Sequence, residues 1–302
     1  MRILVTGGHG QVGRELDRLA RGPGATGATS LWAPGRSELD VTRPHEVLAA
    51  LLDFRPSAVI HAAALTDVDR CEREVELAHQ VNAEATAELA RVCARHRIPL
   101  VYVSTDYVFD GAKGRPYVEG DTPRPLSVYA RTKWQGEQAV SAAGGPHAIV
   151  RTAWVYSIFG RNFAVAILEA ARRSAEEGSG EPLRVVADQV GSPTYARDLA
   201  TALLRMVEMD LASSRRLFHA ANAGACSRWE QARALVALAG WEVPVLPVST
   251  GEMPRPARRP AYSALDSGAL AGEGIAMRPW GEALEAFVRE LAEARPDLVR
   301  RP

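Results

Sequence analysis

The chain has 302 residues, enough for one large domain or for a domain that carries a smaller second lobe. Its 36 Lys and Arg balance 36 Asp and Glu, so no overall field attracts nucleic acid or an anionic membrane. No run reaches the roughly 18 apolar residues of a membrane span, and no secretory signal precedes the apolar residues 3–5. We therefore expect a cytoplasmic protein that binds neither nucleic acid nor membrane.

Residues 1–150 alternate short β-branched runs with longer segments of helical period, as expected for a parallel sheet covered by helices. The expected strands are 3–5, 30–33, 58–61, 100–104 and 148–151, and the expected helices are 12–19, 44–52, 74–95 and 127–142. Strands so continuous in apolar residues need cover on both faces. We predict an α/β fold, a doubly wound parallel sheet of Rossmann type, and a dinucleotide-binding domain over residues 1–150.

Beyond residue 151 the alternation is looser. We expect helices at 163–175, 195–208, 229–239 and 282–294, and strands near 183–186 and 217–219. Residues 243–262 contain five prolines and are predicted to form a loop. Residues 151–302 should form mainly a smaller C-terminal, substrate-binding lobe, with some segments returning to the first domain. A lobe at the carboxyl edge of the sheet would create a ligand crevice.

Metal and disulfide chemistry have little support in the sequence. Cys71, Cys93 and Cys226 are odd in number, widely separated and never in a CxxC pair, so we expect three reduced thiols. The seven histidines form no ligand pair such as HExxH, and no metal site is predicted from them.

A glycine-rich turn, TGGHGQVG, follows the first predicted strand. Gly7, Gly10 and Gly13 are separated by two residues each and stand where the strand meets the first helix. Glycines at such a junction let backbone N–H groups approach a pyrophosphate, which the helix N-terminus also favours. The turn therefore predicts a dinucleotide site.

The ends of the next two strands refine this cofactor. An acidic residue after the second strand typically holds the ribose 2′-OH of NAD, whereas an arginine accommodates a 2′-phosphate. Here no acid stands at the strand end, and Arg36 and Ser37 lie just beyond it. NADPH is therefore favoured, with NADH as the alternative. After the third strand, the small residues Ala62, Ala63 and Ala64 would let the cofactor pass close to the sheet.

Four residues point to proton transfer. Ser104 and Thr105 end the fourth strand, and Tyr129 and Lys133 lie one helical turn apart on the helix that follows. A phenol is a poor acid near neutrality, but an ammonium close to it would stabilise the phenolate and lower the pKa. Thr105 would hydrogen-bond a substrate carbonyl. This set predicts reduction of a ketone by hydride and a proton.

The stretched glycine turn resembles that of the extended short-chain dehydrogenase/reductase superfamily. Further stretches make the chain similar to the dTDP-4-dehydrorhamnose reductase family, whose members are NAD(P)H-dependent. The matching stretches are GGHGQVG, AAALTDVD, VN at Val81 and Asn82, STDYVFDG, VYARTK, RTAWVYS, GRNF, DQVGSPT and RPARRP, in family order over most of the chain.

The resemblance implies roles for individual residues. Thr105, Tyr129 and Lys133 correspond to the catalytic triad. The cofactor would contact Gly7, Gly10, Gln11, Val12, Gly13, Arg36, Ser37, Asp40, Val41, Ala62, Ala63, Ala64, Thr66, Tyr129 and Lys133. The substrate would contact Val68, Ser104, Thr105, Trp154, Asn162, Gln189 and Arg258, with Arg259 as an alternative to Arg258 for the diphosphate.

The implied reaction is reduction of the C4 ketone of dTDP-4-dehydro-L-rhamnose to dTDP-L-rhamnose. Related dehydratases carry an Asp-Glu pair after the threonine, but here Tyr107 follows Asp106, which disfavours dehydration. Two alternatives remain: reduction of another dTDP-4-keto-deoxysugar, and a non-catalytic NADP-binding regulatory subunit. Some relatives dimerise through Mg²⁺ at acidic residues, and Glu15 falls at a comparable position. A homodimer is therefore a further expectation.

Overall fold

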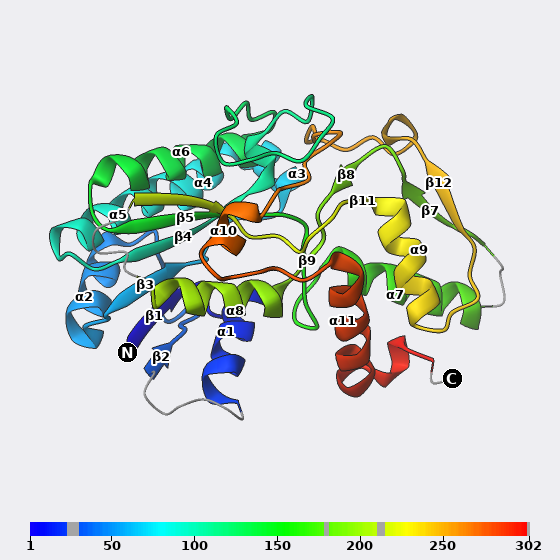
Figure 1. The fold of residues 1–302 in the computed structure, drawn as a ribbon, viewed down its shortest axis with the longest axis horizontal. Coiled ribbons are helices and arrows are strands. Elements are labelled where there is room, and N and C mark those ends of the chain that lie inside the picture. The colour runs from blue at the N-terminus through cyan, green and yellow to red at the C-terminus, as the bar shows by residue number, and fades with distance from the viewer. Residues whose placement is uncertain (23–29, 178–180, 210–214, 301–302) are drawn as a thin grey trace.

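Six parallel strands form the main sheet of the structure, a computed structural model that describes residues 1–22, 30–177, 181–209 and 215–300. Across the sheet the order is β10 (Arg215–His219), β5 (His147–Thr152), β4 (Leu100–Thr105), β3 (Ala58–His61), β1 (Arg2–Thr6) and β2 (Ser30–Trp32) (Figure 1). The order reverses between β1 and β3. Sheets of this kind bind ligands beyond the carboxyl ends of the strands at such a reversal.

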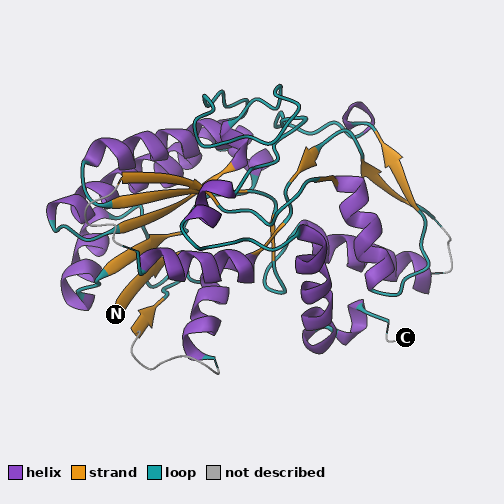
Figure 2. Ribbon diagram, in the orientation of Figure 1, coloured by secondary structure: helices purple, strands orange, loops and turns teal. Residues whose placement is uncertain are grey.

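Helices cover both faces of the sheet (Figure 2), which confirms the predicted doubly wound fold. One face packs against α1 (Gln11–Arg21), α8 (Ala196–Val207) and α10 (Gly268–Gly272), and the other against α2 (Pro44–Phe54), α5 (Ala85–Arg95) and α6 (Val128–Ala143). Successive side chains of β1 alternate between the two layers: Ile3 and Val5 join the first core and Leu4 joins the second. The strands are therefore buried on both sides, as their unbroken apolar runs require.

The segment predicted as one helix over residues 74–95 is instead divided. It contains α4 (Val75–His79), a π-helical turn η1 (Gln80–Glu84) and α5, and α3 (Val68–Arg73) precedes it. Asn82 in the π turn is fully buried, and its side chain bonds the backbone N–H and C=O of Leu65 at 2.8 and 3.1 Å. Single π turns inside helices often accompany functional sites. Here the turn fixes the loop after β3.

A second core belongs to the C-terminal part of the chain. It is built on α7 (Phe163–Glu176), α9 (Arg228–Leu238) and α11 (Trp280–Ala294), with Leu168, Leu235 and Phe287 fully buried between them. Short paired strands surround these helices: β6 (Val155–Tyr156) with β9 (Thr194–Tyr195), β7 (Leu183–Val186) with β12 (Val245–Val248), and β8 (Val190–Gly191) with β11 (Cys226–Ser227). Short helical turns are η2 (Asp106–Val108), η3 (Thr250–Glu252) and η4 (Pro296–Leu298).

Two later segments have positions that composition did not indicate. β10 pairs with β5 at the edge of the main sheet, and α8 packs on the same sheet. The loop predicted over residues 243–262 is wrong at Val245–Val248, where β12 pairs with β7. Pro247 is tolerated because β12 has only one partner strand. The division of the chain near residue 150 into a dinucleotide-binding domain and a substrate-binding lobe, with later segments returning to the first domain, stays a proposal.

The three cysteines are free and buried, as predicted for thiols. Burial raises the pKa of each to about 12, so none is a reactive thiolate. Within the described ranges, no helix combines the length and apolarity needed to span a membrane.

A buried ion pair fastens α6 to the sheet. Arg151 on β5 donates two hydrogen bonds to Glu137 on α6, from Nε at 2.9 Å and Nη2 at 2.7 Å. Ser104 on β4 donates to the same carboxylate at 2.5 Å. All three side chains are buried. Because a buried carboxylate without a partner is costly, this pair restricts where α6 can sit.

We predict that Arg151→Met lowers the free energy of unfolding by about 3–5 kcal/mol, because Glu137 would be left buried without its counter-charge. Urea denaturation measures the change. The matched control is Arg172→Met, which breaks the solvent-accessible pair with Glu176 and should cost at most about 1 kcal/mol. Equal small losses in both variants would contradict the anchoring role of the pair.

Candidate active site

A cleft of about 590 Å³ lies along the carboxyl edge of the sheet, with residues of the C-terminal lobe on its far side. Most predicted site residues line this cleft: Gly7, Gly10, Gln11, Val12, Gly13, Arg36, Asp40, Val41, Ala62, Ala63, Ala64, Thr66, Val68, Ser104, Thr105, Tyr129, Lys133, Trp154 and Asn162. The parallel register explains this gathering, because it brings the ends of β1, β3, β4 and β5 to one edge. Ser37, Gln189 and Arg258 are outside the cleft lining.

The glycine turn offers backbone rather than side chains to the cleft. Gly7 has φ +75°, and a Cβ there would lie 2.8 Å from the backbone of Ala63. A Cβ on Gly13 would lie 2.5 Å from the Gly7 carbonyl oxygen. Beside them, Gln11 Oε1 is buried with no hydrogen-bond partner in the described structure. The turn at the start of α1 therefore has the close-packed glycine backbone that lets N–H groups approach a dinucleotide pyrophosphate.

The end of the cleft next to β2 carries opposite charges. The exposed Arg36 donates from Nε to Asp40 Oδ2 at 3.2 Å. Thr42 donates to Asp40 through both its backbone N–H, at 3.0 Å, and its hydroxyl, at 2.7 Å. The carboxylate therefore holds Arg36 at the cleft entrance, where a guanidinium could meet a phosphate.

At the centre of the cleft, Thr105 and Asp106 share their hydrogen bonds. Thr105 Oγ1 donates to Asp106 Oδ1 at 3.0 Å and accepts the Tyr107 N–H at 3.2 Å. Ser263 donates to the other carboxylate oxygen at 2.5 Å. Burial raises the pKa of Asp106 to about 6, although the bonds from Ser263 and Thr105 act in the opposite direction. A carboxyl group that titrates near neutrality therefore touches the predicted catalytic threonine.

Tyr129 and Lys133 both line the cleft from α6, but among the described residues no hydrogen bond joins their side chains. Burial raises the pKa of Tyr129 above its usual range, despite a hydrogen bond with Thr105. Lys133 Nζ donates to the Val103 carbonyl at 2.7 Å and lies 4.2 Å from the centre of the Tyr102 ring. Burial lowers the pKa of Lys133 to about 7, against the charge of Glu137. The predicted lowering of the Tyr129 pKa is therefore wrong in this structure, where burial decides both pKa values.

Trp154 stands on the lobe side of the cleft in a constrained conformation. Its backbone has φ +47°, and a Cβ on Gly191 would lie 2.4 Å from its indole ring. Its Nε1 is buried and has no hydrogen-bond partner among the residues described. The nearby Asn162 caps α7, accepting the Val165 N–H at 3.1 Å and donating to the Ser157 carbonyl at 2.7 Å. Asn162 thus shapes the cleft but has much of its amide engaged.

Three predicted contacts lie elsewhere. Ser37 is exposed beside Arg36, and Gln189 donates to Thr250 at 3.0 Å. Arg258 is exposed, whereas Arg259 makes a bidentate pair with Asp69 at 2.9 and 3.1 Å. Neither of these two arginines contributes to the lining of the cleft.

Other lining residues were not assigned from the sequence. They include Asp106, Tyr107, Arg161, Phe163 and Arg228. Asp106 and Tyr107 stand next to the predicted threonine, and Arg161 and Phe163 flank Asn162, so their neighbours in the chain could have indicated them. Arg228 follows a two-residue strand in the lobe, and no spacing in the sequence links it to the site.

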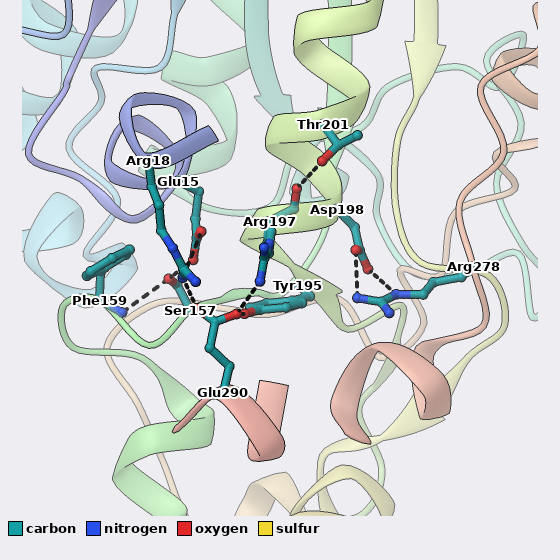
Figure 3. A network of polar contacts seen from close by, with 10 residues as sticks. All are labelled: Glu15, Arg18, Ser157, Phe159, Tyr195, Arg197, Asp198, Thr201, Arg278 and Glu290. Carbon is teal, nitrogen blue, oxygen red and sulfur yellow. Dashed lines mark hydrogen bonds and ion pairs between the residues drawn. The ribbon is translucent and has the colours of Figure 1, made fainter. Parts of the chain in front are cut away.

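The proposed magnesium contact at Glu15 does not fit the structure. Glu15 is fully buried, accepts a hydrogen bond from Ser157 at 2.8 Å and has Arg18 at 3.8 Å (Figure 3). Arg18 also pairs with Glu290, which accepts from Tyr195 and Arg197 at 2.5 and 2.7 Å. Arginine side chains thus lie against both carboxylates, and burial raises the pKa of Glu15. No group of three or more acidic, His or Cys side chains suited to a metal occurs in the described parts of the chain.

Known proteins resemble this chain over nearly its whole length. The family model described as RmlD substrate binding domain matches residues 1–293. The dTDP-4-dehydrorhamnose reductase of Mycobacterium tuberculosis strain H37Rv is 43% identical over 290 residues, covering 94% of this chain and 91% of the relative. A probable dTDP-4,6-dihydroxy-2-methyloxan-3-one 4-ketoreductase of Streptomyces antibioticus is 40% identical, covering 99% of both.

Among solved structures, the dTDP-4-dehydrorhamnose reductase of Bacillus anthracis in complex with NADP has a TM-score of 0.88 and 34% identity. The match covers 96% of this chain and 99% of that one. The shared fold therefore extends over nearly all of this chain.

We predict that Asp106→Asn changes how stability depends on pH. The folded chain keeps the Asp106 proton up to about pH 6, whereas the unfolded chain releases it near 3.8. The wild type therefore loses stability as pH rises through this window, and the variant does not. The unfolding free energy of the variant minus that of the wild type should increase by about 2 kcal/mol between pH 4.5 and 7, measured by urea denaturation. A difference that stays flat with pH would contradict this.

Proposed function

The chain belongs to the dTDP-4-dehydrorhamnose reductase family, and on that premise we propose that it reduces the C4 ketone of dTDP-4-dehydro-L-rhamnose to dTDP-L-rhamnose with NADPH. It is an oxidoreductase of Rossmann type. The observation that carries the proposal is that one cleft joins the glycine turn of α1 to the Thr105–Tyr129 pair and to Lys133. A cofactor seated on the turn would reach these groups.

Each of the cleft residues has a separate role in the proposed ketone reduction. When bound, NADPH supplies the hydride that is added to C4. The carbonyl oxygen must then gain a proton, and Tyr129 is the hydroxyl we assign to donate it. Thr105 bonds the Tyr129 hydroxyl and so aims it. Lys133 is a buried amine beside the cleft; when protonated, its charge would oppose the effect that burial has on the Tyr129 phenolate left after proton transfer.

A second candidate substrate is another dTDP-4-keto-deoxysugar. The 40% identical relative from Streptomyces antibioticus carries the name of a 4-ketoreductase for a different sugar. The proton-transfer residues would serve either ketone, because selection depends on the lobe side of the cleft. A non-catalytic subunit is disfavoured, because binding alone gives no reason for Thr105, Tyr129 and Lys133 to share the cleft. Action as a homodimer and a cytoplasmic location stay predictions.

NADPH rather than NADH is the proposed cofactor. Arg36 lines the cleft after β2, where the 2′-phosphate of the adenosine ribose would lie. Asp40 also binds the Arg36 guanidinium. Because Thr42 holds the Asp40 carboxylate through two further hydrogen bonds, Asp40 would stay in position if Arg36 turned to a phosphate. Ser37 stays a proposed contact that would require its exposed side chain to turn toward the ribose.

The reaction can be tested by following NADPH oxidation with a set of dTDP-4-keto-hexoses and determining product stereochemistry by NMR. We expect Tyr129→Phe to lower kcat about 100- to 10,000-fold, because it removes the proton donor, while NADPH affinity stays within about threefold. Turnover that survives in Tyr129→Phe would refute the assigned role. A wild type that binds NADPH but turns over no keto-sugar would favour the regulatory subunit.

The cofactor preference has its own test. Arg36→Ala should lower kcat/KM for NADPH about 10-fold, the effect of losing one exposed guanidinium–phosphate contact, and leave kcat/KM for NADH within about twofold. Arg43→Ala is the matched control, since Arg43 is also exposed but pairs with Glu46 outside the cleft. Equal losses with the two cofactors in Arg36→Ala would argue against a phosphate contact.

A further inference from the structure

Arg228 brings a positive charge to the lobe side of the cleft. It is the first residue of α9, whose N-terminus is capped by Ser227, and its side chain joins the cleft lining. Its guanidinium carbon lies 3.5 Å from the centre of the Trp154 ring and 4.7 Å from that of Phe163. The stem and plane of the side chain are therefore held by aromatic surfaces rather than by a carboxylate.

The charge of Arg228 is only weakly compensated inside the protein. Within the described ranges, its side chain donates hydrogen bonds to two neutral groups, Gln231, at 3.3 Å, and the Tyr107 hydroxyl. Asp106 acts on it electrostatically, but no ion pair joins Arg228 to a carboxylate in the described ranges. Burial lowers the pKa of Arg228, so the cation carries a desolvation cost that its neighbours only partly offset. An anionic ligand in the cleft would supply the missing counter-charge.

The position of Arg228 relative to Tyr129 suggests which anion this is. The Tyr107 ring, which Arg228 reaches, packs edge-on against the Tyr129 ring with their centres 6.1 Å apart. A sugar whose C4 lies at Tyr129 carries its diphosphate on C1, across the six-membered ring. The diphosphate would therefore point away from the nicotinamide end and toward the lobe. The glycine turn, at the other end of the cleft, would hold the pyrophosphate of the cofactor.

We propose that Arg228 binds the diphosphate of the sugar nucleotide and thereby selects activated sugars over free ones. The proposal rests on the proposed function, in that it assumes a nucleotide sugar as substrate. A planar guanidinium suits this task because it can stack on Trp154 and still direct N–H groups at phosphate oxygens. The same stacking keeps the indole ring, and so the wall beside the sugar, in place.

The test compares Arg228→Gln with Arg228→Lys and with the control Arg233→Gln. Arg233 lies on the same helix and also stacks on a tryptophan, Trp229, 4.9 Å away, but it is outside the cleft lining. Calorimetric titration would measure binding of dTDP and of uncharged thymidine to the NADP-loaded protein. We expect Arg228→Gln to weaken dTDP binding 10- to 100-fold with thymidine affinity unchanged. Arg228→Lys should recover part of the loss, and Arg233→Gln should behave as the wild type.

Two results would overturn the proposal. If dTDP affinity is unchanged in Arg228→Gln, the side chain does not contact the diphosphate. If dTDP and thymidine lose affinity equally, Arg228 only maintains the shape of the cleft through Trp154. Thermal melting and NADPH titration of each variant establish that the fold and cofactor site are intact. Because these are binding measurements, Arg228-dependent dTDP binding without turnover of any keto-sugar would refute the proposed reaction and leave this inference standing.

Discussion

The site depends first on the buried pair between Glu137 and Arg151. α6 carries Tyr129 and Lys133, and this pair, joined by Ser104, ties the helix to β4 and β5 at defined hydrogen-bond positions. Replacing such a pair by apolar residues often costs no stability, so its contribution lies in restricting geometry rather than in net free energy. A purely apolar contact could allow α6 to slide or rotate, which would move the phenol relative to Thr105.

Proton transfer in this cleft is limited by how few hydroxyl protons are free. Thr105 has one such proton, and Asp106 and the Tyr129 oxygen compete for it. The bond with Thr105 does not use the Tyr129 proton, which would then be available to a substrate carbonyl. Protonation of Asp106 would weaken the bond that it accepts from Thr105, and burial raises the pKa of this carboxyl group to about 6. Asp106, the residue that follows the threonine here and in the related dehydratases, thus influences which neighbour receives the Thr105 proton.

The sequence predicted the sheet, its covering helices and the nucleotide half of the cleft, because these follow from local patterns that parallel strands bring to one edge. The sequence did not predict the elements whose conformation depends on tertiary contacts. The π turn at Gln80–Glu84 is fixed by the contacts of Asn82 with Leu65, and β12 exists because β7 pairs with it in spite of Pro247. The direction of the Tyr129 pKa shift was missed because burial depends on residues distant in the chain.

On the lobe side of the cleft, the sequence also does not show which arginine is free to bind an anion. A guanidinium is available to an anion only if no carboxylate already holds it, and sequence spacing does not reveal the partner. Arg259 is paired with Asp69 and Arg258 is exposed away from the cleft, although both stand in the stretch that resembles the family motif. Arg228 lies in no such motif, yet Trp154 and Phe163 support its side chain without cancelling its charge. Aromatic support of an arginine thus creates an anion site in a chain whose overall charge is zero.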